Sequence, residues 1–498
     1  MKLFKILTVT LVLFVLSSCE DYLELSPITS ETSATAYDEP AEIEAALLSV
    51  YNAFGGGTGN GHIEYFQWDI LNFQDTRADN AYAGGDVPEL FAVDFLDVTP
   101  TNSRLSWHWG AFYSAINKAN NILERAPLVE DIQFKTARLN QVMGEAYFLR
   151  AYHYYHLVTM FSGVPLITST TKSIQPKDIY VPRSTSQQVY AQILSDLEKA
   201  ISLLPDKFST DLETKGRATS GAANALAAKA HLQKPTPDFQ AALNHIVALE
   251  SSTAKYTLLT DYNKLFDGNN ENNAESIMEV QFDGVVHGSF RPSVLLPPSR
   301  TGQSWRKFIT PSNNLINLYL AEGDIVRLNA TVVFENVNWI DEYWGNQQGL
   351  SVPFVFKWRN AKGWDQSATN NYLLRYGDIV LLKAEALNGL NRFAEAAAQV
   401  NRIRTRVSLP RLTAQQSNSK YALKIAILNE RRLELAFEGE RWNDLIRNGE
   451  AISTMNNLKE RDLRTGQFVN YNMTNDKLFL PIPQTEIGIN PSLIPGFL

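Results

Sequence analysis

The sequence predicts a mainly helical protein whose helices lie in pairs, with a loop-rich region of short strands laid over them. Apolar residues recur at helical spacing through most of residues 39–250, and again from residue 371 onward. Between about 255 and 370, glycine, asparagine and proline become frequent and the apolar runs shorten to the length of strands. Apolar residues make up 44% of the 498-residue chain, which is enough to bury a real core.

The N-terminus has the pattern of a secreted lipoprotein. A short basic start precedes an apolar stretch, residues 6–16, which is too short to span a bilayer as a helix. Two serines then precede Cys19, the only cysteine of the chain, in an order that resembles a bacterial lipobox. We therefore expect a signal peptide over residues 1–18, acylation of Cys19 and attachment to a membrane. The alternative is an ordinary signal peptide with an incidental cysteine.

The residues after Cys19 predict a tether and then one helical body. Glu20 and Asp21 resemble the surface-export signal of Bacteroidetes lipoproteins, and a solvated tether is the alternative. Residues 19–38 form this tether, and the body spans residues 39–498. The lone cysteine excludes an intrachain disulfide and a thiolate metal site. A net charge of −8 without any basic run argues against nucleic acid as a partner.

Helices are expected in the body where apolar spacing and end signals agree. Residues 136–161 are apolar nearly all round, so this helix must be buried. Thr185 and Gln188 have the spacing of a capping box that opens the next helix. The expected helices are 39–54, 107–125, 136–161, 185–204, 218–232, 238–250, 371–388 and 393–407.

Gly389 separates the last two of these helices by a short turn. A helix, a short turn and a second helix, with small alanines where they cross, resembles a tetratricopeptide unit. The spacing between such units is irregular along the chain, so a degenerate array is expected. Such an array leaves one concave and one convex face.

The loop-rich region, residues 255–370, contains five of the nine tryptophans. Strands are expected at 276–282 and 353–358. Trp358 follows the second apolar run, so it is the tryptophan expected in the core. The other four have Gly, Asn, Asp or Ser as neighbours, as exposed loop residues do: Trp305, Trp339, Trp344 and Trp364.

These tryptophans, together with a polar loop at residues 75–82, fit the chemistry of a sugar. A pyranose offers an apolar face, and indole is the flattest apolar surface that a side chain supplies. Its hydroxyl rim needs hydrogen-bonding partners, and the loop supplies Asp75, Arg77, Asn80 and Tyr82. The alternatives are a structural turn, in which Asp and Asn bond their own backbone, and tryptophans that pack the loops onto the scaffold.

A charged cluster near residue 434 is the obvious candidate for catalysis. Glycoside hydrolysis needs two carboxylates, one as acid and one as base or nucleophile. The spacing of four residues between Glu430, Glu434 and Glu438 places them on one helical face, with arginines between them. This pattern favours a charged network that joins helices, and it includes Arg431, Arg441 and Asp444.

Three further motifs are interpreted as structural, so neither a metal nor a cofactor is expected. His153 and His156 have no acidic or cysteine partner near them in sequence, which favours packing. Residues 267–271 lack the full spacing of a calcium loop, and an incidental turn is favoured. Residues 55–59 are glycine-rich but lack the lysine of a phosphate loop, which favours a turn.

Three stretches of the chain resemble the SusD/RagB family. They are residues 145–166, residues 429–447 and residues 480–491, and the second is the most specific. The resemblance implies a tetratricopeptide-based scaffold on the outer face of the outer membrane. It also implies a lid on a SusC-like TonB-dependent transporter that captures oligosaccharide or polysaccharide, or peptides in some relatives, without catalysis. The family motifs are scaffold motifs, so they carry over no ligand-binding residue.

The leading hypothesis is a surface glycan-binding lipoprotein that delivers oligosaccharides to such a transporter. One rival is a surface glycoside hydrolase, which release of new reducing ends from polysaccharide would reveal. The other is a peptide-capturing or purely structural lid, which a glycan array compared with a peptide library would separate from the first.

Overall fold

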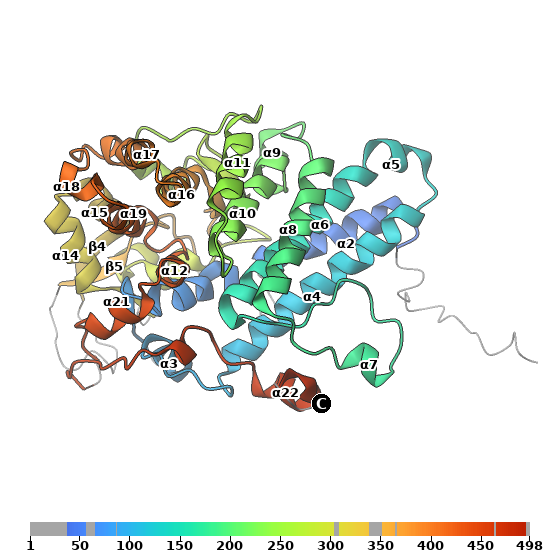
Figure 1. Cartoon of the computed structure of the whole chain (residues 1–498), viewed down its shortest axis with the longest axis horizontal. Helices are drawn as coiled ribbons and strands as arrows, with labels where there is room; N and C mark the ends of the chain where they lie inside the picture. Colours follow the sequence, from blue (N-terminus) through green and yellow to red (C-terminus); the bar gives the residue numbers. More distant parts are fainter. Residues whose placement is uncertain are drawn as a thin grey trace, which may run out of the picture.

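The computed structural model describes residues 37–55, 65–85, 87–302, 308–337, 351–363, 366–462 and 465–494. Within these ranges the chain is mainly helical, with three sheets of two strands each, which confirms the predicted fold class (Figure 1). No helix among the described residues is both long and apolar enough to cross a membrane. The predicted signal peptide and Cys19 lie outside the described residues.

The bounds of the elements follow in chain order. The helices of the first half are α2 Pro40–Gly55, α3 Pro88–Asp94, α4 Ser103–Arg125, α5 Ile132–Ala137, α6 Leu139–Phe161, α7 Pro176–Ile179, α8 Ser186–Leu203, α9 Asp211–Gly216, α10 Ser220–Gln233 and α11 Phe239–Glu250. Those of the second half are α12 Arg291–Leu295, α13 Pro298–Thr301, α14 Asn313–Glu322, α15 Ile325–Thr331, α16 Tyr376–Gly389, α17 Phe393–Arg406, α18 Ala414–Ser417, α19 Lys420–Leu435, α20 Arg441–Arg447, α21 Ala451–Asn457 and α22 Gln484–Ile489. The strands are β1 Ala81–Ala83, β2 Ser276–Val280, β3 Ile309–Pro311, β4 Val332–Asn336, β5 Ser351–Val355 and β6 Asn371–Arg375.

Helix α6 lies at the centre of the N-terminal helices. It packs against α4 on one side and α8 on the other, and its whole second half is buried. Phe148, Tyr154 and their neighbours supply apolar area around the full circumference, so no face of this helix is left for water. The prediction of a buried helix is therefore confirmed, although its first turn is the separate short helix α5.

Two local signals position the helices that cover α6. The Thr185 hydroxyl accepts from the amide of Gln188, and the Gln188 side chain accepts from the amide of Thr185, so the predicted capping box opens α8. Helix α10 is rich in alanine and packs against both α8 and α11. Small side chains allow this close approach.

The helix predicted over 371–388 is shorter than expected. Residues 371–375 form strand β6, which pairs antiparallel with β2, and α16 begins only at Tyr376. The apolar run before Tyr376 fits either structure, and pairing with β2 decides for the strand because it satisfies the backbone in a buried place. At the other end, a Cβ on Gly389 would lie 2.3 Å from the ring of Phe239 in α11. Close approach of a neighbouring helix therefore explains this glycine.

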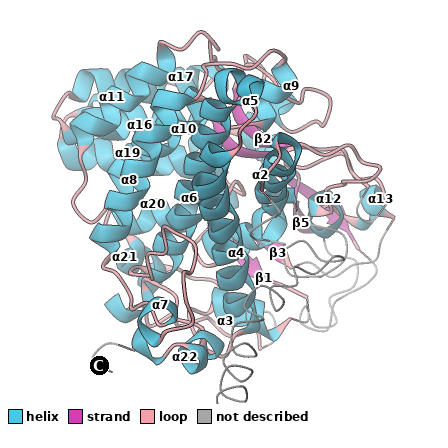
Figure 2. Cartoon of the chain, turned by 90° about the vertical axis from the view of Figure 1, so that its right-hand side faces the viewer, coloured by secondary structure: helices cyan, strands magenta, loops and turns pink. Residues whose placement is uncertain are grey.

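Strand β5 and the short helices α12 and α13 lie on one side of the molecule. Figure 2 shows them on the right of the view and the helices α8, α11, α16 and α19 on the left. The two strands predicted from sequence are found as β2 and β5. Trp358, which follows β5, is 1% exposed, and its ring packs edge-on to Phe266, so its placement in the core is confirmed.

Candidate functional site

The 75–82 segment, predicted to be an exposed ligand loop, is buried. Asp75 is 0% exposed and accepts hydrogen bonds from Asn80 Nδ2 at 2.8 Å and from the amides of Phe437 and Gly439. Burial raises the pKa of its carboxyl to about 6, although these donors oppose the shift. The predicted exposure is wrong because the turn after α19 closes over this segment and uses its polar atoms.

The other residues predicted in this segment point in different directions. Asn80 Oδ1 accepts from Arg432 Nε at 2.9 Å. Arg77 is 3% exposed, and its Nη2 donates to the carbonyl of Lys477 at 2.9 Å. Tyr82 lies within β1, opposite Thr310 of β3. The four side chains therefore do not form one exposed surface, and ligand binding by them stays a prediction.

All four predicted platform tryptophans, Trp305, Trp339, Trp344 and Trp364, lie outside the described residues. The described residues that flank them are informative. Strand β3 follows Trp305 and pairs with β1, and the Ser312 hydroxyl donates to the carbonyl of Asp79 at 2.6 Å. The chain leaves the described part after Val337 and returns at Ser351, the partner of Asn336 in the β4–β5 sheet. Strand β3 also contacts β5, so the fold does bring the 75–82 segment alongside these flanks.

The predicted charged network is confirmed, and Glu434 is its centre. This side chain is 0% exposed and forms ion pairs with Arg375 at 2.8 Å, Arg327 at 3.2 Å and Arg406. Burial alone would raise the pKa of Glu434, but the three guanidinium groups hold it well below its usual range. An enclosed carboxylate that stays ionised at neutral pH has no proton to donate and no path to a glycosidic bond.

The rest of the cluster also joins elements of the scaffold. Arg431 pairs with Asp378 of α16 at 2.7 Å and with Asp444 of α20 at 2.9 Å. Arg441 pairs with Asp79 at 2.7 Å. Because α19 ends at Leu435, Glu438 is not on the predicted helical face, and it pairs with Lys357 at 2.7 Å instead.

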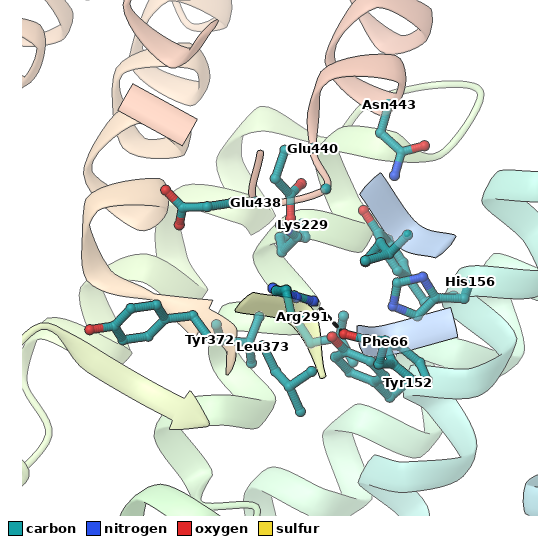
Figure 3. A pocket seen from close by; sticks show the side chains of 15 residues that line it. Phe66, Tyr152, His156, Lys229, Arg291, Tyr372, Leu373, Glu438, Glu440 and Asn443 are labelled. Carbon is teal, nitrogen blue, oxygen red and sulfur yellow. Dashed lines mark hydrogen bonds and ion pairs between the residues drawn. The ribbon is translucent and has the colours of Figure 1, made fainter. Parts of the chain in front are cut away.

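An enclosed cavity lies between α6, α10 and the turn after α19 (Figure 3). Lys229 of α10 lines it and donates to Glu440 at 2.7 Å, and Arg291 of α12 also lines it and donates to the carbonyls of Phe66 and Gln67. Burial raises the pKa of Glu440 to about 7, with Asp378 and Asp444 adding to the effect against Lys229. The cavity measures about 20 Å³, which is room for about one water molecule and not for a sugar.

The two histidines of α6 pack in the core. The His153 ring stacks on Phe54 at 5.4 Å, and burial lowers its pKa to about 3. His156 lies 3.2 Å from the hydroxyl of Tyr65. Among the described residues no group of three or more His, Cys, Asp or Glu side chains could hold a metal ion. In the 267–271 turn, Asp267 accepts from the amide of Asn269 at 2.8 Å, which supports the interpretation as a turn.

Open hollows lie elsewhere on the described surface. One of them, about 840 Å³, runs along α17, where Ala394, Ala397 and Arg411 line it. Another, about 570 Å³, lies between the end of α6, the residues after α3 and residues 475–481. Sequence reasoning missed this second hollow because its walls come from segments hundreds of residues apart.

Comparison with known proteins settles the family. Residues 21–232 match a family described as "Starch-binding associating with outer membrane", and residues 336–495 match the SusD family. The chain belongs to the SusD family. Members of this family are binding proteins without catalytic activity, which excludes the rival glycoside hydrolase. The first description also associates the family with the outer membrane.

Relatives of this SusD-family protein match it over nearly its full length. The chain is 28% identical to SusD-like protein P38 and 27% identical to SusD-like protein P2, both of Formosa agariphila, with at least 99% of each chain covered. Among solved structures, a SusD superfamily protein from Bacteroides vulgatus aligns with a TM-score of 0.78 at 24% identity, over 92% of this chain and 99% of that one. A laminarin binding SusD-like protein aligns with a TM-score of 0.75 at 27% identity, over 92% of this chain and 100% of that one.

Proposed function

We propose that this protein binds oligosaccharides at the outer membrane and delivers them to a SusC-like TonB-dependent transporter. The observation that carries the proposal is the 27% identity, over 92% of the chain, to a laminarin binding SusD-like protein of the same fold. Laminarin is a glucan without charged groups, so neutral gluco-oligosaccharides are the first ligands to test. No described feature favours peptide capture over this function.

The binding surface in this proposal is an aromatic platform of Trp305, Trp339, Trp344 and Trp364. It is supported by the position of their described flanks beside the 75–82 segment. The buried Asp75, Asn80 and Arg432 then act as positioning residues that hold this segment, because their hydrogen bonds are internal. Each well-placed ring adds about 1 kcal/mol beyond its area burial.

The proposal includes an N-terminal lipid on Cys19 that holds the protein to the membrane. The support is the position of the only cysteine directly after the apolar stretch. Cys19→Ala should release the protein from the outer-membrane fraction or leave it unprocessed. A variant that still fractionates with the outer membrane would show that another feature anchors the chain.

Binding is tested by titration of the protein with laminari-oligosaccharides in a calorimeter. At least one of the four Trp→Ala variants should lose binding while its melting temperature stays unchanged. Trp107→Ala is the matched control, because this tryptophan is 36% exposed on α4 and belongs to no predicted platform. If every platform variant binds like the wild type, the platform lies elsewhere, and if no oligosaccharide or polysaccharide binds at all, the proposed function is wrong.

Delivery to a transporter is tested separately. Affinity purification after mild detergent extraction at native expression should recover a large barrel protein together with this chain. Recovery of the chain alone would argue against the lid role, and it would leave the glycan titration as an independent result.

A further inference from the structure

Arg77 is a buried cation without a carboxylate partner among the described residues. Its Nη2 donates to the carbonyls of Lys477 and Leu478, its guanidinium stacks 4.4 Å from the ring centre of Trp442, and its Nε has no hydrogen-bond partner. Burial alone lowers its pKa to about 9, so the group stays charged at neutral pH. Arg431 is also buried, but it pairs with two carboxylates. Burial of a charge without such a pair costs free energy, so the unpaired Arg77 needs an explanation.

This unpaired cation lines the open hollow of about 570 Å³ named above, which we call the Arg77 pocket. Two more cations line the same pocket. Arg183 donates to the carbonyl of Gly163 at 2.8 Å and to that of Phe161 at 3.2 Å, and within the described chain it pairs with no carboxylate. Lys477 donates to the carbonyl of Tyr471 at 3.3 Å. All three positive groups therefore donate to backbone carbonyls, and none of the three forms an ion pair with a carboxylate within the described part of the chain.

The pocket has fewer acidic residues than basic ones, and the acidic residues are exposed to solvent. Asp97 and Asp476 line it, and both are exposed. Three cations against two carboxylates leave the pocket positive, in a chain whose net charge is −8. The charge of this pocket therefore runs against that of the molecule as a whole, which indicates a local function.

The wall of the pocket is held in an unusual backbone conformation. Ser162 has φ 62° and ψ −119°, a region that residues with a side chain rarely adopt. The two carbonyls that Arg183 binds belong to Phe161 and Gly163, the neighbours of Ser162 on either side. A cationic side chain thus fixes a strained turn at the wall of an open pocket, and such strain is concentrated at binding sites.

We propose that the Arg77 pocket binds an anionic sugar unit, one that carries a carboxylate or a sulfate ester, as part of a longer oligosaccharide. This inference rests on the proposed function. Guanidinium and ammonium groups attract the oxygens of carboxylate and sulfate and form charge-assisted hydrogen bonds with them. The volume is within the usual range for a small-molecule site, and Phe479 adds an aromatic ring to the wall. Asp97 and Asp476 at the rim supply acceptors for sugar hydroxyls.

The test uses the full chain and three probes: a glucuronate-bearing oligosaccharide, a sulfated oligosaccharide and neutral laminarihexaose. At least one anionic probe should bind, with an affinity that falls as the salt concentration rises. Arg183→Gln and Lys477→Gln should each weaken that binding about tenfold and leave laminarihexaose binding unchanged. The first two probes distinguish a carboxylate from a sulfate ester as the preferred group.

Control variants distinguish binding in the Arg77 pocket from a general effect of the protein's surface charge. Arg411→Gln removes a cation from the hollow along α17 and should change no affinity. Arg77→Lys keeps the charge and should retain partial binding of the anionic probe, whereas Arg77→Gln should abolish it. If Arg77→Gln lowers the melting temperature, the affinities of Arg183→Gln and Lys477→Gln for the anionic probe decide the question alone.

Different results would contradict the inference about the Arg77 pocket and the proposed function. Binding of laminarihexaose without binding of either anionic probe overturns the inference and leaves the function intact. Binding of an anionic probe that is unaffected by Arg183→Gln and Lys477→Gln also overturns it, because the anion then sits elsewhere. A protein that binds none of the three probes contradicts both.

Discussion

The helices around α6 and those around α19 both bury large side chains, but ion pairs make up a much larger part of what is buried around α19. Around α6 most buried residues are apolar or aromatic, with Phe148 and Tyr154 fully enclosed, and the pair Arg150–Asp196 is an ionic exception. Around α19 the enclosed residues include Glu430, Arg431 and Glu434, each of which forms ion pairs with other helices or strands. Apolar packing tolerates small rearrangements, whereas a buried ion pair is stable only in one geometry. The first region therefore supplies bulk stability, and the second fixes how α16, α17 and α19 meet.

Removing one charge from the second region should have one of the two largest effects on stability. Glu434→Gln leaves Arg327, Arg375 and Arg406 around a neutral side chain, and the free energy of unfolding should fall by about 3–5 kcal/mol. Glu395→Gln, which removes an exposed pair with Arg392, is the control and should change little. Urea denaturation of both variants measures this, and equal stabilities would show that the network contributes nothing.

An apolar deletion of similar size should respond differently to pH. Phe148→Ala should lower the free energy of unfolding by about 3–5 kcal/mol at any pH at which the protein is folded. The folded-state pKa of Glu434 lies below its usual value of 4.5, so the unfolded chain binds the extra proton and the contribution of Glu434 is lost as the pH falls below about 4.5. The loss caused by Glu434→Gln should therefore shrink in acid, while that caused by Phe148→Ala should not. Parallel pH profiles would contradict the distinction.

A smaller effect of opposite sign is expected at Glu440. Its folded-state pKa is raised from 4.5 to about 7, so between these values the folded protein holds a proton that the unfolded chain has released. Stability then falls as the pH rises from about 4.5 to about 7, and Glu440→Gln should flatten this part of the profile. Glu450, whose pKa is lowered, beside Lys424, is the control residue, since Glu450→Gln should leave the slope unchanged in this range. An equally steep profile for Glu440→Gln would assign the slope to another group.

The same comparison explains what the sequence could predict. Helix α6, the capping box of α8 and the core position of Trp358 follow from local spacing, and the structure confirms each. The charged network was predicted because its glutamates and arginines are close in sequence. The individual partners were not, since Arg327 and Arg375 come from other elements.

The candidate site was harder to predict because its contacts are distant in sequence. Asp75, Arg77 and Asn80 have the composition of an exposed sugar-binding loop, and nothing near them in sequence signals burial. Their partners are Phe437, Lys477 and Arg432, more than 350 residues away. The chemistry of the residue types was therefore visible in the sequence, and only the fold decides whether that chemistry faces a ligand or the protein itself.

The smallest expected effect lies at the N-terminus of α8, on the surface of the apolar region. The Thr185 hydroxyl accepts from the amide of Gln188 at 3.2 Å, and Thr185→Ala removes this acceptor and leaves an amide of the first turn to water. The free energy of unfolding should fall by about 1 kcal/mol. Gln188→Ala removes the reciprocal bond to the amide of Thr185 and should cost less, because the hydroxyl still caps the helix. Thermal melts of the two single variants and of the double variant would measure this, and additive losses would show that the two bonds of the box act independently. A double variant that loses no more than Thr185→Ala alone would instead show that the glutamine bond depends on the threonine cap, so that this helix end, like the ionic region, is stabilised by a cooperative pair.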